Sequence, residues 1–217
     1  ALKGKACADD FYLRSIESVL RTTHISDNGY RPLYGPSMEY TYGNTIYKKG
    51  AMVWHSLRGY LGDSLFYASM QRLFSSAAFG NLDSWQLRDS LSLYSGMDLT
   101  GFFDLHVFRP GFVDYLIDDF HTERQADGWH TTIALRQQLA HCDSTAPTSG
   151  HRVPVTFFHQ HRPIATRIVA FDGETGTAEF ILDQEPHYAI PDYYSTLSDA
   201  VTDADTLITA RRTIEFP

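Results

Sequence analysis

The sequence predicts an α+β multidomain protein, with an N-terminal all-helical subdomain over residues 1–111 and a C-terminal β-sandwich over residues 112–217. Two observations support this division. Up to residue 109, apolar residues recur at steps of three and four, which is the period of an amphipathic helix. After Gly111 the period changes to two, which is the period of a half-buried strand. The chain has 217 residues, 43% of them hydrophobic, so it can bury a substantial core.

The first two helices are expected over residues 9–22 and after Tyr47. Asp9 or Asp10 can cap the first helix, because a carboxylate accepts hydrogen bonds from the free N–H groups of a helix N-terminus. Its buried face is expected to hold Leu13, Ile16 and Leu20. Gly50 marks the start of the second helix and Gly62 its end. The buried face of this second helix is predicted to consist of Ala51, Trp54, Leu57 and Leu61.

Three further helices complete the predicted helical subdomain. Asp63 is the expected N-cap of the first of them, and its buried stripe would be Leu65, Phe66, Ser69, Met70, Leu73 and Phe74. Asp83 with Gln86 forms a capping box for the next helix, which ends at Gly96. Asp98 caps the last helix, and Pro110 ends it because proline has no N–H to donate.

The predicted β-sandwich begins with two long alternating runs. One face of the second run holds Trp129, Thr131, Ile133, Leu135, Gln137 and Leu139. Two more strands are expected over residues 153–158 and 164–171. The segment 172–176, rich in glycine, is predicted to be a hairpin turn into a strand over residues 177–182. A short helix is expected within residues 197–208, before an apolar stretch near Ile214.

The charge and cysteine content exclude some functions and leave others open. The net charge of −8 disfavours nucleic acid and anionic membrane surfaces as partners, because both require a basic face. No apolar run approaches the ~18–20 residues of a membrane span, so we expect a soluble chain. Cys7 and Cys142 match no metal-binding spacing; we interpret them as unrelated thiols, although a disulfide stays open. They do not fix the compartment, and an extracytoplasmic location stays open.

Four tyrosines gather in the turn-rich segment 24–45, namely Tyr30, Tyr34, Tyr40 and Tyr42. A long aromatic loop ahead of a helix can line a substrate cleft. The alternative is that these rings simply pack the loop onto the core.

Ten histidines invite a search for a metal site. The motif His-Glu-x-x-His, which places two imidazoles on one helix face, is absent. His159 and His161 have the spacing that would place both rings on one face of a strand, but no third ligand lies nearby in sequence. We therefore favour an ordinary polar face there. His106 is interpreted as a core histidine of a helix and not as a ligand. No nucleophile elbow or phosphate-binding glycine loop is present.

The segment from Tyr47 to Ala51, Tyr-Lys-Lys-Gly-Ala, is the strongest functional signal. Further motifs follow it in order: Leu61-Gly62-Asp63, Phe66, Ser95-Gly96-Met97-Asp98-Leu99, Phe102-Phe103 and Pro110-Gly111. This ordered set resembles the Tyr-x-Lys-Gly-Ala segment and following helices of the M1 (gluzincin) aminopeptidases. One departure is His106, which stands about where that family usually has a tryptophan.

The resemblance implies a fragment of a zinc aminopeptidase that hydrolyses N-terminal peptide bonds, in which Tyr47 stabilises the tetrahedral intermediate. In that family the zinc ligands and the catalytic glutamate precede this segment, so we expect the zinc, as the cofactor of the parent protein, to be held by an upstream part of the same polypeptide. The chain also lacks an initiator Met, and we interpret it as a piece of a longer protein. We expect no zinc and no peptidase activity in this fragment alone. The peptide-binding residues stay unknown.

Two alternatives to a catalytic role remain. The parent protein could be a non-catalytic scaffold of the same type, which the upstream gene sequence would reveal by the absence of His-Glu-x-x-His. Alternatively, the β-sandwich could be a separate sugar- or peptide-binding module. Its aromatic binding face would then be formed by Trp129, Tyr188, Tyr193 and Tyr194.

Overall fold

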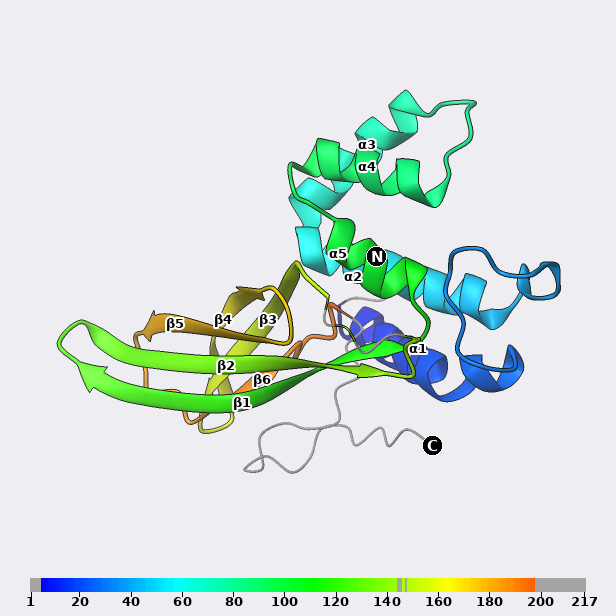
Figure 1. The fold of residues 1–217 in the computed structure, drawn as a ribbon. Helices are drawn as coiled ribbons and strands as arrows, with labels where there is room; N and C mark the ends of the chain where they lie inside the picture. Colours follow the sequence, from blue (N-terminus) through cyan, green and yellow to red (C-terminus); the bar gives the residue numbers. More distant parts are fainter. Residues whose placement is uncertain (1–4, 144–145, 147, 198–217) are drawn as a thin grey trace.

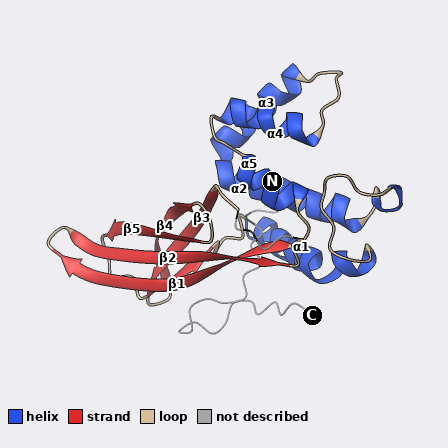
Figure 2. Cartoon of the chain, in the orientation of Figure 1, coloured by secondary structure: helices blue, strands red, loops and turns tan. Residues whose placement is uncertain are grey.

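The fold is described from a computed structural model, which covers residues 5–143, 146 and 148–197, with side chains from residue 11 onward (Figure 1). Within these ranges the helices come first and the strands follow, as the sequence predicts (Figure 2). The helices are α1 (Lys5–Ser26), α2 (Gly50–Leu61), α3 (Asp63–Ser76), α4 (Ser84–Ser95) and α5 (Thr100–Phe103). Two π-helical turns, Thr45–Lys49 and Asp104–Phe108, precede α2 and follow α5. A 3₁₀ turn covers Met38–Tyr40.

Helix α1 is longer than predicted. It begins at Lys5, so Asp9 and Asp10 lie within the helix and not at its N-cap. Residues 5–8 include two alanines, which have the highest helix propensity and allow the helix to extend in this direction. The predicted inward positions Ile16 and Leu20 are buried.

Helix α2 has the predicted ends but buries a different face. Gly62 follows it with φ of 79°, a conformation that glycine adopts without strain. Leu57 and Leu61 are buried as expected, whereas Ala51 and Trp54 are exposed. The buried face consists of Met52, Ser56, Leu57, Tyr60 and Leu61. Sequence periodicity could not show this rotation, because it depends on which distant segments pack on α2: α1 packs against Met52, and Leu197 contacts Ser56.

The next two helices give one correction and one confirmation. Asp63 is the first residue of α3 and not its cap; its carboxylate instead pairs with Arg58 at 2.7 Å. In the predicted α3 stripe, Leu65 and Phe74 are exposed, so the helix buries only a narrow face. The capping box of α4 is confirmed: Asp83 accepts a hydrogen bond from the Gln86 backbone at 2.7 Å, and the Gln86 side chain accepts one from the Asp83 backbone at 3.1 Å.

The strands form two antiparallel sheets of three strands each. The first has the order β1 (Phe112–Gln125), β2 (Gly128–Ala140) and β5 (Thr175–Leu182). The second has the order β4 (Arg162–Phe171), β3 (His151–His159) and β6 (Tyr188–Pro191). The alternation predicted for β2 is confirmed at its centre, where Thr131, Ile133, Leu135 and Gln137 are buried.

The turn at residues 172–176 is not a hairpin. It leads from β4 in one sheet to β5 in the other, and β5 pairs with β2 in the register that places Leu135 opposite Gly176. A glycine-rich turn between two strands therefore marks a crossing between sheets here. Gly176 is suited to this crossing because a Cβ at this position would overlap the Phe171 side chain.

The two sheets pack against each other and against the helices. The Phe157 ring of β3 lies 6.4 Å from the Phe120 ring of β1 and 5.8 Å from the Phe180 ring of β5. One buried cluster extends from Leu57 and Leu91 of the helices into both sheets. The division at residue 111 into separate domains therefore stays a prediction. Figure 1 shows α3 and α4 extending away from this core and the long β1–β2 hairpin extending in another direction.

Some expectations concern residues outside the described ranges. The helix predicted within residues 197–208 and the apolar stretch near Ile214 fall there, apart from Leu197, which is buried. The side chain of Cys7 is likewise not described, whereas Cys142 is a free, half-buried thiol whose pKa burial raises. Among the described residues, no helix combines the length and apolarity needed to cross a membrane.

Candidate functional site

Tyr47 lies in the π-helical turn Thr45–Lys49, directly before α2. Its N–H donates to the Gly43 carbonyl at 3.2 Å. The side chain is 60% exposed, and its ring lies beside that of Tyr42, with centroids 6.4 Å apart. π-Helical turns are rare and are frequent at functional sites. The structure therefore places the Tyr47 side chain as expected, at the start of a helix and facing outward.

The phenol of Tyr47 is available to a ligand. Within the described part of the chain, its hydroxyl has no hydrogen-bond partner. This contrasts with Tyr60, whose hydroxyl donates to the Gly150 carbonyl at 2.6 Å, and with Tyr115, which is bonded to His151 at 2.9 Å. Tyr47 thus has an unused donor on an exposed surface, whereas these two buried tyrosines have structural partners. Its catalytic role stays a prediction.

Two side chains hold the Tyr47 turn in place: those of Ser26, the last residue of α1, and of Asp27, which directly follows it. The buried carboxylate of Asp27 accepts hydrogen bonds from the backbone N–H groups of Asn44 at 3.0 Å and Thr45 at 2.5 Å. The Asn44 side chain donates to the Ser26 hydroxyl at 2.6 Å. Burial by itself would raise the pKa of Asp27, but the hydrogen bonds from Thr45 and Asn44, together with the charge of Arg31, lower it overall.

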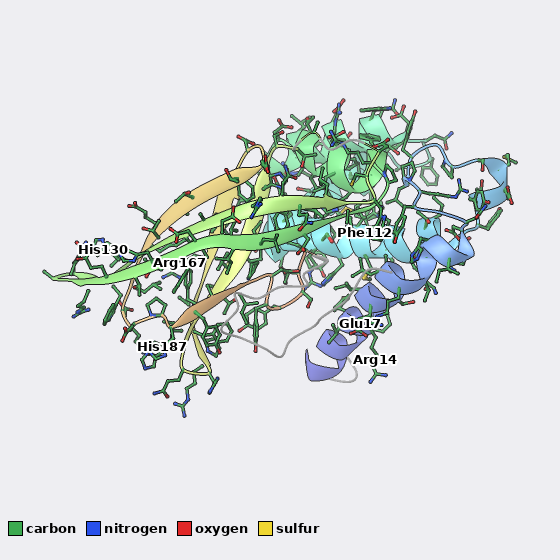
Figure 3. All side chains as sticks on the ribbon, turned by 60° about the horizontal axis from the view of Figure 1, so that its bottom comes forward. Arg14, Glu17, Phe112, His130, Arg167 and His187 are labelled. Atoms are coloured by element: carbon green, nitrogen blue, oxygen red, sulfur yellow. The ribbon has the colours of Figure 1, made fainter. Side chains whose placement is uncertain are left out.

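Lys49, the last residue of the same turn, points into the protein interior. It is 6% exposed, and its ammonium donates to the Gly111 carbonyl at 2.9 Å and lies 5.2 Å from the Phe112 ring centroid. Figure 3 shows Phe112 where β1 begins beside the helices, whereas His130 lies toward the far end of the β1–β2 hairpin. Lys49 lines a pocket of about 30 Å³ between α1, α2 and the start of β1. Burial lowers the pKa of Lys49 to about 8.

His106 lines the same pocket and is a packed histidine, as interpreted from the sequence. Its ring lies 4.5 Å from that of Phe102. Burial, and then the charges of Lys49 and His151, lower its pKa to about 3, so the imidazole is neutral at pH 7.

The tyrosines of segment 24–45 divide between the two expected roles. Tyr30 is stacked between His24 and His141, with centroid distances of 4.6 and 4.0 Å. Tyr34 and Tyr40 also pack locally, Tyr34 edge-on against Phe108 and Tyr40 beneath the Arg31 guanidinium. Only Tyr42 of these four stands next to Tyr47, and it is 82% exposed. Most of the loop aromatics therefore pack, and one borders the candidate site.

The histidines do not form a metal site with the expected geometry. Strand β3 ends at His159, and Gln160 has φ of 56°, so the strand alternation that would align His159 with His161 is interrupted. His159 bonds to the Glu185 carbonyl at 2.8 Å. Among the described residues, no three His, Cys, Asp or Glu side chains are grouped so that they could hold a metal ion.

Of the four aromatic residues considered as a sugar- or peptide-binding face, Tyr188, Tyr193 and Tyr194 gather around Phe158, whereas Trp129 lies apart from them. Trp129 belongs to the β1–β2–β5 sheet, beneath the Arg124 guanidinium. Tyr188 belongs to the other sheet, where it stacks on Phe158 with centroids 4.8 Å apart. Tyr193 packs edge-on against the same Phe158 ring, and only Tyr194 of the four is largely exposed.

Sequence reasoning missed two residues around the Tyr47 turn. Asp27 begins an Asp-Asn-Gly sequence, which is typical of a turn and gives no sign of a distant contact. Its contact with Thr45 joins residues 18 positions apart, and no sequence period reports such a contact. The sequence gives a weak indication that Lys49 is buried. Lys49 lies four positions before Val53 and seven before Ser56, so helical spacing places it on the same face as these two residues, which is the face that packs inward.

Comparisons with known proteins agree on one group of enzymes. No protein-family model matches the chain. Aminopeptidase N of Lactococcus lactis subsp. lactis is 33% identical over 67 residues, which are 31% of this chain and 8% of that protein. Aminopeptidase N of Streptomyces lividans is 34% identical over 92 residues, which are 42% of this chain and 10% of that protein.

The fold has a similar solved counterpart. The crystal structure of Legionella pneumophila aminopeptidase A in complex with aspartic acid matches 76% of this chain and 18% of its own, with a TM-score of 0.57 and 16% identity. The chain therefore corresponds to a small part of each of these proteins. In the sequence of a short segment and in the fold of most of its length, the chain resembles part of an aminopeptidase.

Proposed function

We propose that this chain is part of a zinc aminopeptidase of the M1 (gluzincin) type, and that Tyr47 donates a hydrogen bond to the oxyanion of the tetrahedral intermediate. The observation that carries the proposal is the exposed Tyr47 hydroxyl at the start of α2, which has no hydrogen-bond partner among the described residues and lies within a Tyr-x-Lys-Gly-Ala segment. The similarity to two aminopeptidases N supports the peptidase assignment.

The chemistry that we assign to Tyr47 is electrostatic. When water attacks a peptide carbonyl, negative charge develops on the carbonyl oxygen, and a fixed donor stabilises that charge more than it stabilises the substrate. A phenol suits this task because it is a directed donor with an ordinary pKa near ~10 and therefore carries its proton at neutral pH. The position of Tyr47 in a helical turn fixes its backbone, so little reorganisation is needed during the reaction.

The described residues do not fit a zinc site, since they contain no suitable group of three ligands. The proposal assigns the metal ligands and the general base to an upstream part of the same polypeptide. The substrate of the parent protein would be a peptide with a free N-terminus.

The proposal is tested in the full-length protein that contains this chain, by Tyr47→Phe. This change removes one hydroxyl from an exposed ring, so the fold should be unaffected. We expect kcat for hydrolysis of aminoacyl p-nitroanilides to fall by about 10²–10³-fold, as for the loss of one oxyanion donor. The matched control is Tyr42→Phe, which removes the hydroxyl of the neighbouring exposed tyrosine and should change kcat less than about threefold.

Two results would contradict the proposal. The first is a Tyr47→Phe enzyme with the kcat of the wild type. The second is zinc-dependent peptidase activity in the isolated 217-residue chain, which would mean that the metal site lies within it. A folded full-length protein with no peptidase activity at all would instead support the non-catalytic scaffold.

A further inference from the structure

We infer that Asp27 is a positioning residue for Tyr47, because its buried carboxylate fixes the backbone turn that carries the phenol. The kinetic part of this inference rests on the proposed function of Tyr47. The structural part stands on the geometry of the turn alone, and the experiment below separates the two.

The Asp27 carboxylate is placed where the Tyr47 turn has free donors. The first N–H groups of any helical segment have no partner within the helix. Here the N–H of Asn44 donates to Oδ1 of Asp27 at 3.0 Å and that of Thr45 donates to Oδ2 at 2.5 Å. A negative charge at a helix N-terminus is also favoured by the helix dipole. Unlike an ordinary N-cap, this one comes from the residue that directly follows another helix, α1, and lies 17 and 18 residues earlier in the chain.

Asp27 is itself held rigidly. Its side chain and backbone are 98% buried, its N–H donates to the Thr23 carbonyl at 3.0 Å, and its carbonyl accepts from Arg31 Nε at 2.6 Å. Gly43 allows the close approach, since a Cβ there would lie 2.8 Å from Oδ2 of Asp27. The end of α1 and the start of the Tyr47 turn therefore form one fixed unit.

Tyr47 depends on this unit because little else holds its side chain. The ring is 60% exposed, and its ring contact is with Tyr42, which is itself 82% exposed. The direction of the phenol is then set mainly by the backbone of the turn Thr45–Lys49. The first residue of this turn, Thr45, is two positions before Tyr47, and its N–H is the one that donates to Asp27. A hydrogen-bond donor that is misplaced by about 1 Å can lose a hundredfold in rate.

Asp27→Asn in the full-length protein is the sharpest test. The amide has almost the same shape, but it offers one acceptor where the carboxylate offers two, and its NH₂ group faces a backbone donor. We expect kcat to fall by about 10- to 100-fold, with KM changed less than about twofold, because an oxyanion donor acts in the transition state.

Asp192→Asn is a matched control. Asp192 is 6% exposed, and its carboxylate likewise accepts two backbone N–H groups, from Thr196 at 2.6 Å and Leu197 at 3.0 Å. The same chemical change is thus made at a similar cap that does not bind the Tyr47 turn. Both variants should lose stability, as measured by Tm, but only Asp27→Asn should lower kcat.

Hydrogen exchange of the full-length protein tests the structural part directly. In Asp27→Asn, the amides of residues 44–47 should exchange at least about tenfold faster than in the wild type, whereas in Asp192→Asn they should not. Unchanged exchange at residues 44–47 overturns the inference, whatever the activity. Faster exchange with an unchanged kcat, in a protein in which Tyr47→Phe does lower kcat, overturns it as well. If Tyr47→Phe leaves kcat unchanged, the proposed function of Tyr47 fails, and the exchange result alone decides whether Asp27 fixes the turn.

Discussion

Gly59 of α2 lies directly against the backbone carbonyl of Thr196, so closely that a Cβ at position 59 would overlap the carbonyl oxygen. Two hydrogen bonds flank this contact: His55 bonds to the Ser195 carbonyl at 2.8 Å, and Ser56 donates to the Leu197 carbonyl at 2.8 Å. The segment that follows the last strand is therefore docked along the helix that begins after Tyr47.

We expect Gly59→Ala to destabilise the chain by about 1–3 kcal/mol, the usual cost of overpacking, because the new methyl group must push residues 195–197 off α2. Gly50→Ala is the control in the same helix. A Cβ there meets only Leu33, at 3.8 Å, and alanine favours a helix over glycine, so stability should rise by up to about 1 kcal/mol. Urea unfolding followed by circular dichroism measures both. Equal effects of the two changes would mean that the contact with Thr196 is unimportant.

Features with local causes could be predicted from the sequence. The α4 capping box needs only Asp83 and Gln86 three residues apart, and the structure contains both of its hydrogen bonds. The buried face of β2 follows from strict alternation at Ile133 and Leu135, since a strand that packs on one side must place every second residue inward. The left-handed Gly96 after α4 was predictable for the same reason: glycine adopts this conformation without strain.

Features with long-range causes could not be predicted. The turn near Gly173 has the residues of a hairpin, yet the strands on either side belong to different sheets, because β5 finds its partner in β2. In α2, Trp54 fits the helical period but is 38% exposed, since residues 195–197 cover the other side. At the candidate site, the place of Tyr47 followed from local sequence, whereas Asp27 acts from 18 residues away.

The capping box itself gives a second prediction. Asp83→Ala should lower the free energy of unfolding by about 1 kcal/mol, because the first N–H groups of α4 lose their acceptor. Asp89→Ala is the control: this residue lies in the same helix, is exposed, and pairs on the surface with its neighbour Arg88. The control should change stability by less than about 0.5 kcal/mol. Chemical unfolding of both variants under the same conditions tests the difference, and an Asp83→Ala chain as stable as the Asp89→Ala chain would contradict it.

One buried histidine, His151, and two half-buried ones, His55 and His106, should make the chain sensitive to mild acid. Burial lowers the pKa of His55, His106 and His151 from the ordinary value of 6.5. Below pH 6.5 the unfolded chain therefore binds more protons at these sites than the folded chain does, and stability falls as the pH falls. Above about pH 7.5 all three are essentially neutral in both states and contribute no pH dependence.

The contribution of His106 can be isolated. Its folded pKa of about 3 lies well below the unfolded value, so its share of the stability is lost progressively from pH 6.5 downward. Between pH 6.5 and 4.5 this share is on the order of 2–3 kcal/mol. His106→Phe keeps an aromatic ring beside Phe102 and should flatten the pH dependence of unfolding by that amount. His121→Gln, at an exposed position, should leave the slope as it is. An unchanged slope in His106→Phe would contradict this prediction, because it would mean that His106 binds its proton equally well in the folded and unfolded chains.

Lys49 is the least favourable buried charge near the candidate site, and removing that charge should stabilise the chain. Its ammonium has a single carbonyl acceptor and no carboxylate partner among the described residues. Burial lowers its pKa from 10.5 to about 8, so the folded chain loses this proton before the unfolded chain does. Stability therefore increases as the pH rises from about 8 to 10.5, and below pH 8 the full cost of the buried charge remains.

Lys49→Met replaces the ammonium by an apolar group of similar length within an apolar pocket. Removing the buried charge should stabilise the folded chain by on the order of 3 kcal/mol. Losing the hydrogen bond to the Gly111 carbonyl should reduce this gain by about 1 kcal/mol. We expect the variant to be more stable than the wild type by about 1–3 kcal/mol at pH 7, with this advantage disappearing by pH 10.5. Lys48→Met, at the exposed neighbouring position, controls for the loss of a surface charge and should show neither effect. If Lys49→Met is more stable than the wild type by the same amount at pH 7 and at pH 10.5, the prediction is wrong. A gain that came from removing the buried charge must shrink over this range, because the wild-type ammonium loses its proton there.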